Sequence, residues 1–208
     1  MRPDAVMVTL TFGEFWASAQ VGFLRDAEAV LMQRVERFAE KKTGELWGAH
    51  IQSAIAELAV AKHLRRHWGF GVNEFHVPDI TGLPVEVRWT DRADIKVRPD
   101  DKPHMFVVGV GPVPAEHKPP KPTSLQLGQY RVAINGWIRA GDGKRPEWEC
   151  KDEPPCYFAP HSSVLVCKAT DLKKALRAWV EAENADKTAA AVPPLPSLTS
   201  DDIDFGLK

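Results

Sequence analysis

The sequence has few of the features that mark secreted, membrane-spanning or strongly charged proteins. Its three cysteines among 208 residues are too few, and odd in number, for a disulfide scaffold, so we expect a reducing cytoplasm. No apolar run approaches the roughly 18 residues that cross a membrane. The first residues also lack the apolar core and cleavage site of a secretion signal. A formal net charge of −1 excludes binding to nucleic acid through overall charge, so any contact with DNA requires a local basic patch.

What remains is the composition of an ordinary globular protein, with 44% hydrophobic and 26% charged residues. The length suits one sizeable domain with appendages. We expect an N-terminal helical region packed on the core (1–47), a main domain (48–185) and a flexible acidic tail rich in alanine, proline and serine (186–208).

Three segments have the apolar periodicity of helices, namely residues 11–42, 49–68 and 170–184. The first is expected to begin with Thr11 as N-cap and Glu14 completing a capping box. Gly22 is a place where this helix can divide into two. Thr170 is the expected cap of the third helix.

Five short β-rich segments lie between the second and third helices, at residues 71–77, 83–90, 94–98, 105–111 and 129–138. We expect residues 141–160 to be irregular. Helices followed by a run of strands and a final helix predict an α+β or mixed α/β fold around a single central sheet.

The strand at 83–90 carries charge in an apolar setting. Glu86 and Arg88 alternate with apolar residues, so they point together to one face of the strand while the apolar side chains point into a core. Six residues separate Asp79 from Glu86, and a short turn between them would bring the two carboxylates together. Such a pair repels unless a cation lies between them, and oxygen ligands suit Mg²⁺.

The preceding helix adds a third carboxylate. Glu57 lies on a face of small and apolar residues, where a buried carboxylate needs a partner. We expect it to reach the same cation if the helix packs against the sheet. The alternative is an exposed helical Glu57 beside a solvent-facing strand that carries an ordinary Arg–Glu pair and a turn aspartate.

Together these residues resemble the PD-(D/E)xK nuclease superfamily. The matching features are "PD" at 78–79, "EVR" at 86–88, the helical Glu57 before them and "GWI" at 136–138. The resemblance covers about residues 48–140 and is to small phage and bacterial members, so a phage-encoded protein is one expectation.

The resemblance implies an αβββαβ, restriction-endonuclease-like core and hydrolysis of DNA phosphodiesters with Mg²⁺ or Mn²⁺ in the host cytoplasm. Asp79, Glu86, the Val87 backbone carbonyl and Glu57 would hold the metal. Arg88 fills the position of the family's lysine. Asp79, Glu86, Arg88 and Glu57 are therefore the expected catalytic residues.

Arginine in that position is a departure from the family pattern. Unlike lysine, Arg88 cannot lose a proton and act as a base, although it can offer charge and hydrogen bonds to a phosphate. Lys96, in the next strand, is a candidate for a migrated lysine. A catalytically inactive DNA-binding or scaffold module with the nuclease fold, from a replication, recombination or virion assembly, therefore stays open as the alternative.

A basic stretch ends the second helix. Lys62, Arg65 and Arg66, with Lys96, are the expected contacts to the DNA backbone. The competing interpretation is a favourable interaction of these charges with the C-terminus of the helix.

Two further interactions are left open by the sequence. The tail segment Asp201–Phe205 resembles the acidic tip of bacterial single-stranded-DNA-binding proteins and is a candidate for docking on a replication or assembly protein; the alternative is a solvated tail. The helix at 11–42 either covers one side of a DNA channel or mediates self-association into a homo-oligomer.

Overall fold

The computed structural model describes most of the chain, at residues 4–32, 45–72, 77–91, 94–113, 129–150, 155–160, 162–163 and 165–191. The chain forms two compact units, Met1–Lys173 and Lys174–Lys208. Helices and strands are mixed, as predicted, but the strands form two sheets and not the single expected one. Within the described ranges, no helix is both long and apolar enough to cross a bilayer.

The first unit begins with a strand that the sequence analysis did not predict. β1 (Val6–Thr11) leads directly into helix α1 (Phe12–Leu31). The predicted capping box is confirmed: the Glu14 amide donates to Thr11 Oγ1 at 3.2 Å, and the Thr11 amide donates to Glu14 Oε2 at 2.7 Å. Residues 33–42 of the longer predicted helix lie outside the described residues.

Helix α2 (Glu45–Leu64) begins and ends about four residues before the predicted range. Arg65 stops it in a left-handed conformation, with φ 56°. The Arg66 amide donates to the Ala61 carbonyl at 2.9 Å and the Arg65 amide to the Lys62 carbonyl at 3.1 Å. This is the Schellman pattern, which more often uses glycine. His67 and Trp68 therefore follow the helix and are not part of it.

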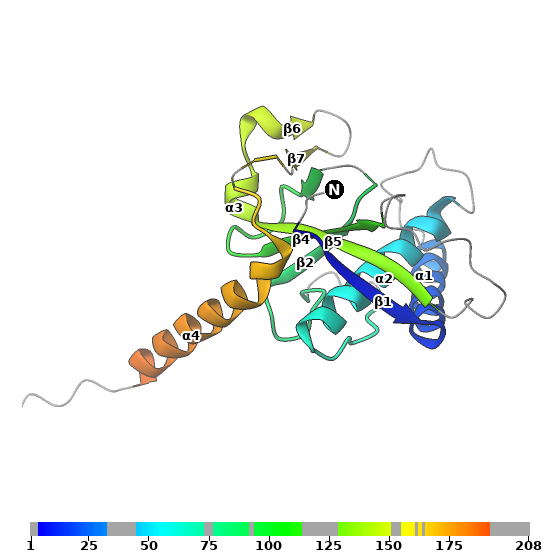
Figure 1. The fold of residues 1–208 in the computed structure, drawn as a ribbon, viewed down its shortest axis with the longest axis horizontal. Helices are drawn as coiled ribbons and strands as arrows, with labels where there is room; N and C mark the ends of the chain where they lie inside the picture. The colour runs from blue at the N-terminus through cyan, green and yellow to red at the C-terminus, as the bar shows by residue number, and fades with distance from the viewer. Residues whose placement is uncertain are drawn as a thin grey trace, which may run out of the picture. The chain divides into compact units, whose positions relative to one another are not determined.

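Gly22 marks a close approach of α1 and α2, and the predicted break in α1 at this residue is wrong. A Cβ built at Gly22 would lie 2.6 Å from the backbone N and Cα of Ile51. The two backbones are so close there that only glycine fits without a shift, and the helix continues through this residue. Figure 1 shows α1 and α2 as neighbours beside the strands.

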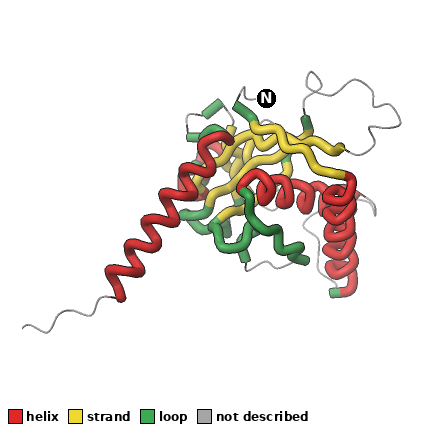
Figure 2. Tube along the Cα trace, turned by 60° about the horizontal axis from the view of Figure 1, so that its bottom comes forward, coloured by secondary structure: helices red, strands yellow, loops and turns green. Residues whose placement is uncertain are grey.

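The larger sheet has the order β1-β5-β4-β2, with β2 at Val85–Trp89, β4 at Phe106–Pro112 and β5 at Gln129–Arg139. β2 pairs in parallel with β4, whereas β4–β5 and β5–β1 are antiparallel. α2 packs against β2, and Figure 2 shows the twisted strands as a layer with helices against it. β2 is thus an edge strand of this sheet, and the candidate site lies on it.

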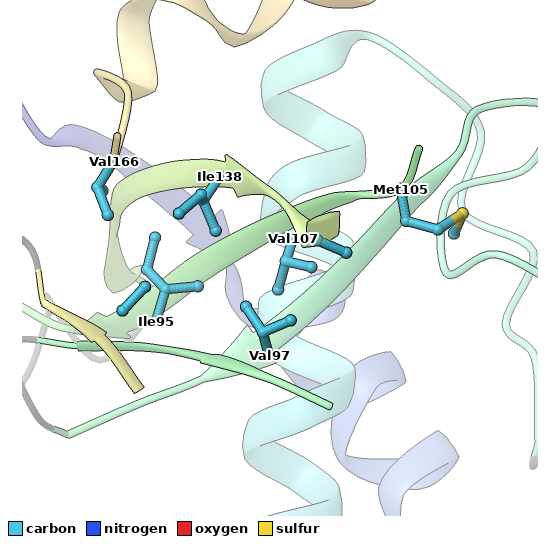
Figure 3. Packing of buried hydrophobic residues seen from close by; sticks show 8 residues of the cluster. Ile95, Val97, Met105, Val107, Ile138 and Val166 are labelled. Carbon is cyan, nitrogen blue, oxygen red and sulfur yellow. The ribbon is translucent and has the colours of Figure 1, made fainter. Parts of the chain in front are cut away.

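The smaller sheet has the order β3-β7-β6, with β3 at Asp94–Val97, β7 at Cys156–Pro160 and β6 at Glu149–Cys150. Its residues Ile95 and Val97 pack on Val107 and Ile138 of the larger sheet, so the two sheets share a core (Figure 3). The region 141–160 was predicted to be irregular. It contains two of these strands, the short helix α3 (Ala140–Gly143) and the 3₁₀ turn η3 (Pro146–Trp148).

The second unit consists, in its described part, of helix α4 (Leu172–Ala191). The helix extends past the predicted end near residue 184 because the alanines that follow favour helix. Thr170 lies in the preceding 3₁₀ turn η4 (Ala169–Asp171). Residues 73–76 of a predicted strand, and residues 192–208 of the predicted tail, lie outside the described residues.

Substitution of Gly22 tests the close contact between α1 and α2. Gly22→Ala is expected to lower the unfolding free energy by about 1–3 kcal/mol, because the new methyl group must displace the backbone at Ile51. Gly13→Ala is the matched control, since a Cβ on Gly13 meets nothing within 4 Å, and it should leave stability unchanged or raise it by up to about 1 kcal/mol. Chemical denaturation measures both. Equal effects of the two substitutions would contradict the close contact.

Candidate metal and phosphodiester site

The site is built at the open edge of β2. In a parallel pair, alternate residues of an edge strand turn both backbone groups away from the partner strand, and Val87 is such a residue. Its amide donates to Asp79 Oδ2 at 2.6 Å. Its carbonyl accepts from Arg88 Nη1 at 3.1 Å. Asp79 is thus fixed beside β2 through the strand backbone.

The turn after Asp79 makes this contact possible. The Leu83 amide donates to the Ile80 carbonyl at 3.0 Å, and Gly82 has φ 75°, a conformation that favours glycine. The chain thereby reverses between Asp79 and β2. The sequence analysis expected a turn that brings Asp79 close to Glu86, and the structure contains it.

Arg88 is a buried cation surrounded by carboxylates. Nη1 lies 2.9 Å from Glu86 Oε2 and 3.7 Å from Asp79 Oδ2, while Nη2 donates to Asp101 Oδ1 at 2.7 Å. Only 8% of the residue is exposed, so the predicted solvent-facing alternative for this strand is wrong for Arg88. Burial favours the neutral form of Arg88, but Asp101, Asp79 and Glu86 outweigh it and raise the pKa of the guanidinium. Arg88 is therefore a permanent cation here.

Asp101 is a site residue that the sequence analysis did not predict. It is buried in the turn after β3, and its second oxygen, Oδ2, accepts from the Arg98 amide at 2.8 Å. Within the sequence "RPDD" (98–101), Asp101 is typical of an ordinary aspartate in a turn. Only the tertiary fold shows that it binds the guanidinium of Arg88.

Glu57 points inward, as the apolar face of α2 predicted, and only 4% of it is exposed. Arg25 of α1 binds both of its carboxylate oxygens at 2.7 Å and also donates to the Gly71 carbonyl. The Trp68 indole donates to Glu57 Oε2 at 3.3 Å. The exposed alternative for Glu57 is therefore wrong, and its direct partner is an arginine that was not predicted.

The carboxylates act on one another electrostatically. Burial, followed by the charges of Glu57 and Glu86, raises the pKa of Asp79 to about 7, although Arg88 and the Val87 amide act in the opposite direction. Glu57 and Asp79 are therefore parts of one charged cluster, although they come from different elements.

The donor chemistry of this cluster fits a divalent cation. Four carboxylates (Glu57, Asp79, Glu86 and Asp101) face the two guanidinium groups of Arg25 and Arg88, so among these six side chains, when all are ionised, negative charges exceed positive ones by two. Oxygen donors with this excess charge suit Mg²⁺ or Mn²⁺. In the arrangement observed among the described residues, however, no three His, Cys, Asp or Glu side chains are grouped so as to hold a metal ion. Arg88 Nη1 itself contacts Glu86 and the Val87 carbonyl, two of the expected ligands.

The expected DNA-contacting residues lie in different settings. Arg65 and Arg66 are exposed just after α2. Lys62 forms an ion pair with Glu14 at 2.7 Å. Lys96 lies on β3 in the smaller sheet, with Nζ 6.0 Å from the centre of the Phe158 ring. Of the four expected residues, only Arg65 and Arg66 are exposed neighbours. Lys62 is paired with Glu14 of α1, and Lys96 lies on the smaller sheet.

The raised pKa of Asp79 predicts a specific dependence of stability on pH. The pKa of Asp79 is about 7 in the folded protein, whereas its ordinary value is 3.8. At a pH between these two values the folded state binds more protons than the unfolded state, so the protein loses stability as pH rises through this window. Each pKa unit corresponds to about 1.4 kcal/mol, and we expect a loss on the order of 2–4 kcal/mol between pH 4 and 8.

Asp79→Asn removes this titration and is isosteric. Its unfolding free energy relative to the original protein should therefore rise between pH 4 and 8, as measured by urea denaturation in metal-free buffer. A difference between the two proteins that is constant over this range would contradict the raised pKa.

Comparisons with protein-family models, with curated proteins and with solved structures found no match.

Proposed function

We propose that the protein is a metal-dependent hydrolase of DNA phosphodiesters with a PD-(D/E)xK-like core. The observation that carries this proposal is the pair Asp79 and Glu86 at the edge strand β2, both against Arg88 Nη1, with the charge of Glu57 acting on Asp79. Carboxylates that repel one another in this way destabilise a fold, and a bound divalent cation would offset that cost.

Asp79, Glu86 and the Val87 carbonyl are the groups that would hold the ion, since they already lie around one point near Arg88 Nη1. When bound, Mg²⁺ or Mn²⁺ supplies Lewis acidity toward the phosphate and lowers the pKa of a coordinated water. Asp79 is bound to the Val87 amide, which keeps one of its oxygens oriented. Glu57 is oriented by Arg25 and Trp68 and contributes negative charge next to Asp79.

Arg88 has the role of an electrostatic residue in this proposal. Its raised pKa means that it cannot accept a proton from water. Its guanidinium can instead move from Glu86 to donate hydrogen bonds to a phosphate oxygen, where charge develops in the transition state. Asp101 holds the second nitrogen and limits this movement.

Contact with DNA is assigned to the exposed residues Arg65 and Arg66. Both directly follow α2, so they lie at the end of the helix that carries Glu57, one of the site's carboxylates. Arg65 keeps a left-handed backbone in which glycine would be more stable, and strained positions of this kind concentrate at functional sites. Charge at these two positions would bind phosphates without reading sequence.

A second candidate is a non-catalytic DNA-binding module with the same fold. It is favoured by the position of Arg88 Nη1, 2.9 Å from Glu86, 3.1 Å from the Val87 carbonyl and 3.7 Å from Asp79. A permanent internal cation in that place would replace the metal ion and stabilise the fold without chemistry. The docking function proposed for Asp201–Phe205 concerns residues outside the described ranges and stays a prediction.

A nuclease assay tests the first candidate. Purified protein is expected to cut single- or double-stranded DNA with Mg²⁺ or Mn²⁺ and to stop when EDTA is added. Glu86→Gln should lower the rate at least ~100-fold, because it removes a charged ligand. Glu147→Gln, at an exposed position of η3, is the matched control and should cut normally. Binding of DNA without metal-dependent cutting would sink the hydrolase and support the module.

Arg88→Lys tests whether the guanidinium occupies the cation position. Lysine cannot bridge Glu86 and Asp101 as the forked guanidinium does, so it should compete less well with a metal ion. We expect Mn²⁺ to bind the Lys variant at least ~10-fold more tightly in isothermal titration calorimetry. Arg145→Lys, at a surface ion pair, is the control and should bind like the original protein. Equal affinity for all three would mean that Arg88 does not compete with metal.

A further inference from the structure

Helix α1 is oriented the opposite way from an ordinary surface helix, because charged side chains point toward α2 and large apolar side chains point to solvent. Three of its four charged side chains face α2: Glu14 binds Lys62, Arg25 binds Glu57, and Asp26 accepts from the Trp47 indole, while the fourth, Glu28, is half-buried. Large apolar side chains cover the other side and form what we call the outer face of α1, made of Phe12, Trp16, Phe23, Leu24, Val30 and Leu31. Among the described residues, Trp47 of α2 packs on Phe23, with 4.7 Å between the ring centroids, yet each of the six side chains stays at least half exposed. An apolar helix face with this much exposed area is typical of an interaction surface.

The exposure is large and continuous along the helix. Trp16 is 55% exposed and Leu31 is 81% exposed, and the side chains between them recur at helical spacing. From ordinary side-chain areas, the exposed parts of the six side chains sum to roughly 500 Å². A standard interface buries about 800 Å² on each partner, of which about 60%, again roughly 500 Å², is non-polar. The outer face of α1 alone therefore matches one side of a stable protein interface.

The chemistry of this face excludes partners that are charged. Gln20 is the one polar side chain that lies between the apolar ones, and the only basic residue of α1, Arg25, is bound to Glu57. DNA requires cations on the contacting surface. A helix that lies on a membrane usually has lysines and arginines beside its apolar stripe. The matching partner is thus another uncharged, apolar protein surface.

The outer face is complementary to itself in an antiparallel arrangement. Its N-terminal half carries the rings Phe12 and Trp16, Phe23 lies just past the middle, and the rest of its C-terminal half carries the aliphatic side chains Leu24, Val30 and Leu31. Two copies related by a twofold axis near the middle of α1 would pack the rings of each on the aliphatic half of the other. Because the face has no charges, self-contact brings no like charges together.

We propose that the protein forms a homodimer through the outer face of α1, with the two α1 helices antiparallel across a twofold axis. The dimer does not cover the candidate site at the edge of β2 through this face, because Asp79, Glu86 and Arg88 do not belong to the outer face of α1. This proposal does not depend on the proposed hydrolase function.

The oligomeric state in solution tests the dimer. Analytical ultracentrifugation of the full chain at tens of micromolar is expected to give about twice the monomer mass of 23.1 kDa. The double variant Trp16→Glu/Leu31→Glu places charge on the face and should raise the dissociation constant at least 100-fold. Val77→Glu, at an exposed apolar residue outside α1, is the control and should remain dimeric.

Two outcomes would overturn the proposal: a monomer at 100 µM for the original protein, or a dimer that the double variant leaves intact. Circular dichroism and the melting temperature show whether the variants remain folded, which is expected because both substituted side chains are mostly exposed.

Cross-linking tests the antiparallel arrangement separately. Gln20→Cys lies near the middle of α1 and should join two copies through a short bismaleimide. Gly13→Cys should not, because antiparallel helices separate these positions by roughly 25 Å along their axes. The original protein, with its three native cysteines, gives the background. Efficient cross-linking at residue 13 would indicate parallel helices and contradict the arrangement.

Discussion

The buried guanidinium of Arg88 is the interaction on which the edge of β2 depends. Its positive charge is in direct contact with Asp79, Glu86 and Asp101, which come from a turn, a strand and a second turn. Buried carboxylates are tolerable only when they are paired, so these three segments keep their positions because they share one cation. The same arrangement places a permanent cation at the groups that we propose as ligands of a metal ion.

The pairing of Arg25 with Glu57 connects this edge to the helices. Glu57 requires a partner because α2 buries it, and the partner comes from α1. Because Glu14, Arg25 and Asp26 of α1 point toward α2, large apolar side chains occupy the opposite side of the helix. The site and the outer face of α1 therefore have a common origin in the way in which buried charge is neutralised.

Local signals in the sequence were sufficient for part of this architecture. The capping box at Thr11, the alternation in β2 and the inward Glu57 each depend on neighbours within a turn or a strand, and the sequence predicted all three. Arg25 and Asp101 were missed because their partners lie 32 and 13 residues away, where no periodicity relates them. The second sheet was missed for a similar reason: β3 lies in a predicted strand, but its partners β7 and β6 are short and are recognisable only through their pairing. β1 does alternate apolar residues with threonine, and that signal was overlooked beside the stronger pattern of α1.

The left-handed stop at Arg65 has a consequence for the geometry around Glu57. Had α2 continued to Trp68, the 11 residues between them would place the indole roughly 16 Å along the axis from the carboxylate. The reversal instead folds Trp68 back to within 3.3 Å of Glu57 Oε2 and returns the Gly71 carbonyl to Arg25. The left-handed residues Arg65 and Phe70, just past the end of α2, thus allow a residue beyond the helix to donate to a carboxylate within it.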